Sequence, residues 1–156
     1  MADWIEEGLQ APDFTLPAHD GTKLKLSSLR GQPVILYFYP KDDTPGCTKE
    51  ACGFRDSQTQ LTRHKAVVLG MSSDDAESHE QFRKKYKLSF KLLTDVDHTV
   101  AEKYGAWREK NMYGKKSMGI ARSTFIIDAD GKVAKVFKAV RVDGHAAQVL
   151  AALAAL

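Results

Sequence analysis

The sequence of 156 residues contains only two cysteines, Cys47 and Cys52, and no apolar run near the roughly 18 residues of a membrane span. Residues 1–10 carry three acidic side chains and neither a basic segment nor an apolar core, which argues against a secretory signal peptide. The formal net charge of +3 is spread along the chain and gives little support to binding of nucleic acid or membranes. We therefore expect a cytoplasmic protein.

The scarcity of cysteine also limits the kinds of site. The Cys-x-x-Cys spacing of dithiol oxidoreductases is absent, because Cys47 and Cys52 lie five residues apart. A zinc site would need two further ligands, and no two histidines have the His-x₃₋₅-His spacing. We expect the five histidines at the surface or at helix caps: His19, His64, His79, His98 and His145.

The length suits one well-packed domain over residues 1–156, since the sequence shows no repeat, linker or low-complexity segment. Apolar residues make up 43% and charged residues 28%, the balance of an ordinary globular protein. Strand-like and helix-like patterns alternate, which favours an α/β fold. We expect a hairpin around residues 20–21, buried strands at 33–39 and 66–73, a short strand at 90–95, helices at 45–64, 75–86 and 98–105, a hairpin at 122–140 and a last helix from about 143. Trp107 and residues 110–119 have the composition of a long loop.

Cys47 is predicted in the first turn of a helix, directly after a strand and a proline-containing turn. Backbone N–H groups are unpaired there and the helix dipole is positive, so a thiolate is stabilised. Sites of this kind lower the pKa of a cysteine from about 8.5 to between about 3.5 and 7.5. Thr44 supplies a hydroxyl at the start of the helix, and Pro40 and Pro45 fix the turn. Basic residues nearby in the sequence add positive charge: Lys41, Lys49 and Arg55.

Cys52 cannot bond to Cys47 while one helix holds both residues. Positions five apart in a helix have Cα atoms roughly 8 to 9 Å apart and point in different directions. A disulfide needs a Cα separation of about 4.4 to 6.8 Å. The helix must therefore partly unwind before the two thiols can join, and Gly53 lowers the cost of unwinding.

Less reactive interpretations of these residues stay open. Two free cysteines can pack in a core as small hydrophobic side chains. Arg122, directly before the apolar segment 123–127, lies either in a pocket at a strand start or on the surface. The position of Cys47 at a helix start in a polar segment favours the reactive interpretation.

These residues together resemble a peroxiredoxin of the PrxQ type, also called bacterioferritin comigratory protein. The match consists of the motif Pro40-x-x-x-Thr44-x-x-Cys47, the step to Cys52, and Arg122 before the segment STFIID. Residues 110–128 and 142–150 are also similar to the family, so the resemblance covers nearly the whole chain. It implies a thioredoxin-like fold, with a central mixed sheet flanked by helices and an N-terminal β-hairpin.

The resemblance also implies a mechanism. The Cys47 thiolate attacks the O–O bond of hydrogen peroxide or an organic hydroperoxide and becomes a sulfenic acid. Thr44 and Arg122 hold the peroxide oxygens, and Pro40 shields the sulfur from water. Cys52 then forms a disulfide with Cys47, which thioredoxin or a similar dithiol donor reduces. We expect a monomer that needs no metal or organic cofactor.

Two other functions use the same residues. A thiol–disulfide oxidoreductase would share the fold but would need the Cys-x-x-Cys spacing that this sequence lacks. A non-enzymatic redox sensor could use the same reactive cysteine to signal to a partner. Turnover of peroxide with a thioredoxin system separates all three functions.

Overall fold

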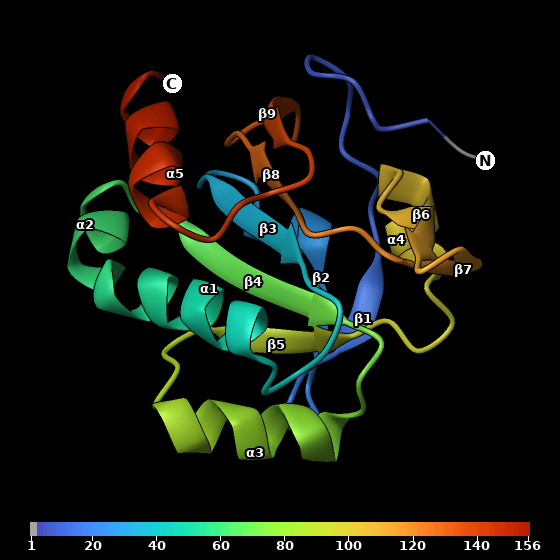
Figure 1. Ribbon diagram of the computed structural model, residues 1–156. Helices are drawn as coiled ribbons and strands as arrows, with labels where there is room; N and C mark the ends of the chain where they lie inside the picture. Colours follow the sequence, from blue (N-terminus) through green and yellow to red (C-terminus); the bar gives the residue numbers. More distant parts are fainter. Residues whose placement is uncertain (1–2) are drawn as a thin grey trace.

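The computed structural model describes residues 3–156 and shows a mixed sheet of five strands in the order β5-β4-β3-β8-β9 (Figure 1). β3 and β5 both run parallel to β4, whereas β8 is antiparallel to both β3 and β9. Two hairpins, β1–β2 and β6–β7, lie outside this sheet. The strands are β1 Thr15–Pro17, β2 Lys23–Lys25, β3 Val34–Phe38, β4 Val67–Ser72, β5 Lys91–Thr94, β6 Trp107–Met112, β7 Lys115–Ile120, β8 Ser123–Ile127 and β9 Val133–Phe137.

Helices cover both faces of the sheet. Helices α1, α2, α3 and α5 contribute buried side chains to one core, while α4 and the β1–β2 hairpin contribute to the other. Figure 1 shows α1 and α5 on one side of the sheet, and α4 with the β6–β7 hairpin on the other. The helices are η1 Leu26–Leu29 (a 3₁₀ turn), α1 Pro45–Asp56, α2 Gln58–Arg63, α3 Ala76–Tyr86, α4 Thr99–Tyr104 and α5 His145–Ala154. Among residues 3–156, no helix is long and apolar enough to cross a membrane.

The central strand β3 explains why the sequence VILYF is apolar throughout. Its side chains alternate between the two cores, with Leu36 and Phe38 on one side and Ile35 and Tyr37 on the other. All five residues are buried, as expected for a strand covered on both faces. The predicted mixed α/β sheet, with its N-terminal β1–β2 hairpin, is confirmed.

The predicted helix over residues 45–64 is divided in two. α1 ends at Asp56, and α2 begins at Gln58. Ser57 between them has φ −95° and ψ 7°, so the helical path is interrupted there. The interruption still leaves Leu61 buried in the same core as Phe54.

The prediction of a long loop at residues 110–119 is wrong, because these residues belong to the β6–β7 hairpin. Its turn is Tyr113–Gly114, where both residues have positive φ, as two-residue hairpin turns require. Four of the six residues of β7 are exposed, and three of these are polar, so the strand lacks the apolar alternation that reveals a strand. Trp107 stacks on His98, with ring centroids 3.6 Å apart.

The prediction of surface or capping histidines is wrong for three of the five. His19, His79 and His145 are buried. Each has hydrogen-bond partners inside the protein, which offset the cost of burying a polar ring. Such partners lie far away in the sequence, so the local pattern around a histidine does not reveal them.

Candidate active site

Cys47 occupies the first turn of α1, directly beyond the end of β3. Thr44 has extended backbone angles at the N-cap, and Pro45 is the first helical residue, where its missing N–H costs nothing. The Cys47 side chain therefore lies among unpaired backbone N–H groups at the positive end of the helix dipole. Only 1% of Cys47 is exposed. The predicted position of Cys47 at a helix start is confirmed.

Arg122 reaches Cys47 because β8 lies beside β3. Ser123 pairs with Phe38 at the end of β3, which brings the preceding Arg122 to the start of α1. Its Nη2 donates to Cys47 Sγ at 3.2 Å. A Cβ atom on Gly46 would lie 3.0 Å from the same Nη2, so the glycine leaves room for the guanidinium.

Glu50 holds the other arm of this guanidinium. Arg122 Nη1 donates to Glu50 Oε1 at 2.8 Å, and the Glu50 side chain is almost fully buried. Burial raises the pKa of Glu50 to about 7, although Arg122 acts in the opposite direction. Among the described residues, Glu50 Oε2 has no hydrogen-bond partner, which leaves that oxygen free to carry a proton. Sequence reasoning missed this role of Glu50.

Two of the basic residues that lie near Cys47 in the sequence are paired elsewhere, whereas the predicted contact of Arg122 is present. Lys49 pairs with Asp143, and Arg55 pairs with Asp56, so neither is directed to Cys47 by these contacts. The near cations are Arg122 and Lys110 of β6. Burial would lower the pKa of Arg122, but Glu50 and Cys47 raise it above its ordinary value. Burial and then Arg122 lower the pKa of Lys110, while Cys47 opposes them, so Lys110 lies within the electrostatic field of the site.

Pro40 and Thr44 begin and end the loop that joins β3 to α1. Pro40 is half-buried, and the Thr44 hydroxyl donates to the carbonyl oxygen of Lys41 at 2.9 Å. This bond closes the loop on itself. It also shows that Thr44 Oγ1 is used within the loop before any substrate arrives.

Cys52 lies in the same helix as Cys47 but in different surroundings. It is half-buried and lines a cavity of about 320 Å³ between α1 and the start of α5, together with Gly53 and His145. Both cysteines are free thiols, and the helix between them is unbroken. The predicted separation of two thiols within one helix is confirmed.

A second polar cluster lies under the loop. Asp42, Asp74 and His79 each offer a possible metal-ligand atom, and these atoms lie within 4.8 Å of one another. However, His79 Nδ1 already bonds to Asp42 Oδ2, and the Asp42 N–H donates to Asp74 Oδ2. The hydrogen bonds satisfy the cluster without an ion.

A buried thiol at the start of the helix after the central strand, with an arginine on its sulfur, defines a cysteine-based redox site on a thioredoxin-like α/β fold. Comparison with known proteins specifies the site further. Residues 8–136 match the AhpC/TSA family. The chain belongs to this family as a peroxiredoxin of the Bcp/PrxQ type.

The relatives resemble the chain over nearly its whole length. A Bcp-type protein of Coxiella burnetii is 55% identical, with 96% of this chain and 99% of the relative covered. Peroxiredoxin Bcp of Bacillus subtilis is 46% identical over 96% of this chain and 95% of its own. A solved structure of the bacterioferritin comigratory protein of Xanthomonas campestris, described for its alkyl peroxide reduction activity, is 38% identical, with a TM-score of 0.91 and coverage of 96% and 98%. The chain is thus a thiol peroxidase that reduces hydroperoxides, as the sequence resemblance implies.

Proposed function

We propose that Cys47 is the residue that reacts with peroxide. Its thiolate sulfur attacks one oxygen of the hydroperoxide, so that an S–O bond forms while the O–O bond breaks. The sulfur is oxidised to a sulfenic acid, and the other oxygen leaves with a proton as water or an alcohol. The observation that carries this proposal is the 3.2 Å contact from Arg122 Nη2 to Cys47 Sγ, which places a permanent cation on the nucleophile.

Arg122 and Thr44 are assigned to binding the peroxide, and Pro40 to shielding the sulfur. Arg122 supports the negative charge that develops on the departing oxygen, because its guanidinium is already at the sulfur. The Thr44 hydroxyl donates to a peroxide oxygen after turning from the Lys41 carbonyl. Pro40 has no N–H and limits the access of water to the sulfur.

Cys52 is assigned as the resolving residue. Its thiolate attacks the Cys47 sulfenic sulfur, the S–S bond forms, and water is released. Since α1 separates the two residues, the helix unwinds between the two chemical steps. A dithiol such as thioredoxin then reduces the disulfide by thiol–disulfide exchange and is itself oxidised.

The range of substrates and the cellular compartment follow from the same chemistry. Hydrogen peroxide and organic hydroperoxides both present an O–O bond, and the activity described for the Xanthomonas relative supports alkyl hydroperoxides. A cycle that ends in reduction by a dithiol suits the reducing cytoplasm. The whole cycle uses one chain, so we propose a monomer whose residues 1–156 form one functional domain, with no metal or organic cofactor required.

The experiment is NADPH-coupled turnover of peroxide with thioredoxin and its reductase. Cys47→Ser abolishes turnover, because a hydroxyl is a poor nucleophile at neutral pH. Cys52→Ser still consumes one equivalent of peroxide but does not cycle with thioredoxin. Turnover retained by Cys47→Ser would remove this residue from its role. A protein that forms the disulfide but is not reduced by thioredoxin would favour the redox-sensor function.

A further inference from the structure

The loop from Pro40 to Thr44 takes its shape from contacts with α3. Asp43 has φ 58°, a left-handed conformation that residues other than glycine rarely adopt. Its carboxylate accepts bonds from Lys85 Nζ at 2.7 Å and from the Tyr86 hydroxyl at 2.8 Å. Such a conformation persists only where the surroundings determine it strongly. The site loop therefore depends on a helix that contributes nothing directly to the thiol.

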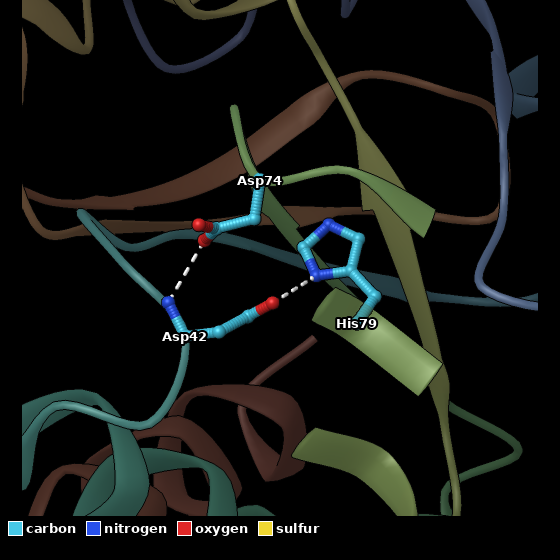
Figure 2. A group of neighbouring side chains, drawn as sticks. All are labelled: Asp42, Asp74 and His79. Carbon is cyan, nitrogen blue, oxygen red and sulfur yellow. Dashed lines mark hydrogen bonds and ion pairs between the residues drawn. The ribbon is translucent and has the colours of Figure 1, made fainter. Parts of the chain in front are cut away.

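Asp42 is the buried attachment point of this loop. Its carboxylate accepts from the Tyr39 hydroxyl at 2.5 Å and from the Ser78 hydroxyl at 2.8 Å. His79 Nδ1 lies 2.7 Å from the same carboxylate, and the Asp42 N–H donates to Asp74 at 2.8 Å. Figure 2 shows dashed lines from Asp42 to both other side chains, to Asp74 above it and to His79 on its right. One loop residue is thus bonded to the end of β3, to α3 and to the segment between β4 and α3.

His79 has acceptors at both ring nitrogens. Nε2 lies 3.0 Å from the carbonyl oxygen of Leu93 in β5, which can only accept. Nδ1 faces the Asp42 carboxylate, which already accepts two hydroxyl bonds. His79 is therefore held at both ends of its ring, by the Leu93 carbonyl at Nε2 and by Asp42 at Nδ1. The result is a buried hydrogen-bonded chain from Asp42 through His79 to Leu93, which connects the loop to β5.

We infer that His79 is a positioning residue for peroxide reduction. The imidazole ring, held by the Leu93 carbonyl, fixes Asp42 and thereby the loop that presents Pro40 and Thr44 to the substrate. This inference rests on the proposed roles of Pro40 and Thr44. Arg122 directly precedes β8 instead, so its contact with Cys47 does not pass through His79.

Arg122 acts on the Cys47 sulfur directly, whereas His79 acts through the loop. Two reagents can therefore separate the two effects. Iodoacetamide needs only a nucleophilic sulfur, whereas peroxide also needs the loop. We measure the rate constants of reduced Cys47 with both reagents in His79→Gln, in a Cys52→Ser background. The reaction with hydrogen peroxide should fall at least about tenfold, while alkylation stays within about twofold of the parent.

His19→Gln is the matched control. His19 is also buried and also bonds to the backbone of β5, through the Leu92 N–H, but none of its hydrogen bonds reaches residues 40–44. It should leave both rates within about twofold of the parent, given comparable folding. An unchanged peroxide rate in folded His79→Gln would overturn the inference. An equal fall in both rates would also overturn it, because a general loss of structure affects both reagents alike.

One further variant keeps the inference open to refutation if His79→Gln does not fold. Asp42→Asn removes the charge of the partner with little change in shape, and the same selective loss of peroxide reactivity is expected. An unchanged peroxide rate in folded Asp42→Asn would contradict the inference. Turnover by Cys47→Ser would instead refute the proposed function, whatever the state of His79.

Discussion

The two cysteines of α1 share a helix but differ in what surrounds them. Cys47 is buried against Arg122, at the end of a loop that Asp42 attaches to α3. Cys52 is half-buried beside a cavity, and Gly53 follows it. The contact across to α5 there includes the largely exposed Lys49–Asp143 ion pair, a type that contributes little to stability. The difference agrees with the proposal that the Cys47 end is organised for reaction and the Cys52 end for movement.

The largest expected effect concerns Glu50, the buried carboxyl beside Cys47, and the pH dependence of the free energy of unfolding. Burial raises the pKa of Glu50 from 4.5 to about 7, so between these pH values the folded protein holds a proton that the unfolded chain has lost. The free energy of unfolding therefore decreases as pH rises through this range, by at most about 3 kcal/mol. Glu50→Gln should remove that decrease. Denaturant unfolding of the reduced parent and of reduced Glu50→Gln at pH 4.5 and pH 8 measures this change. An equal change in the free energy of unfolding with pH in the two proteins would contradict the pKa assignment.

The second-largest effect is expected from Arg122→Ala, which should lower the reactivity of Cys47 with peroxide. Loss of one charge-assisted contact to the sulfur predicts a rate constant with peroxide at least about tenfold lower, about 1.4 kcal/mol. Stopped-flow measurement of the reduced protein gives this rate. Arg108→Ala removes a cation that contacts Trp4 and the Gly105 carbonyl instead, and serves as control. A folded Arg122→Ala protein with the parent rate would make Arg122 a bystander.

Gly53→Ala tests the Cys52 end and should have the smallest effect. The added Cβ would lie 3.7 Å from Ala146 Cβ, an ordinary contact, so the residue fits the reduced helix. Alanine stabilises a helix by about 1 kcal/mol relative to glycine, which should slow disulfide formation by up to about fivefold. Sulfenic acid formation at Cys47 should keep its rate and provides the internal control. Slowing of both steps together would mean that the two ends are not independent.

The sequence predicts well those parts of the fold and the site that depend on residues adjacent in the chain. The buried β3 strand, the helix start at Cys47 and the hairpin of β8 and β9 all follow from apolar runs, prolines and turn residues that lie next to one another. The separation of Cys47 and Cys52 follows from helix geometry alone.

Features that depend on distant partners were not predictable in this way. His79 is buried because Asp42, 37 positions earlier in the sequence, folds onto it. Lys49 pairs with Asp143, just before α5, and Lys110 approaches the thiol only through the polar β6–β7 hairpin. The place of Arg122 came from family resemblance, since no local pattern distinguishes it from a surface arginine.

Hydrogen exchange in the two redox states tests the central claim most directly. If α1 holds Cys47 and Cys52 too far apart to bond, the backbone must change when the disulfide forms. Amides of residues 46–54 should exchange slowly in the reduced protein and faster in the disulfide form, while β3 and β4 stay equally protected in both. Equal protection of residues 46–54 in a verified Cys47–Cys52 disulfide would contradict the account.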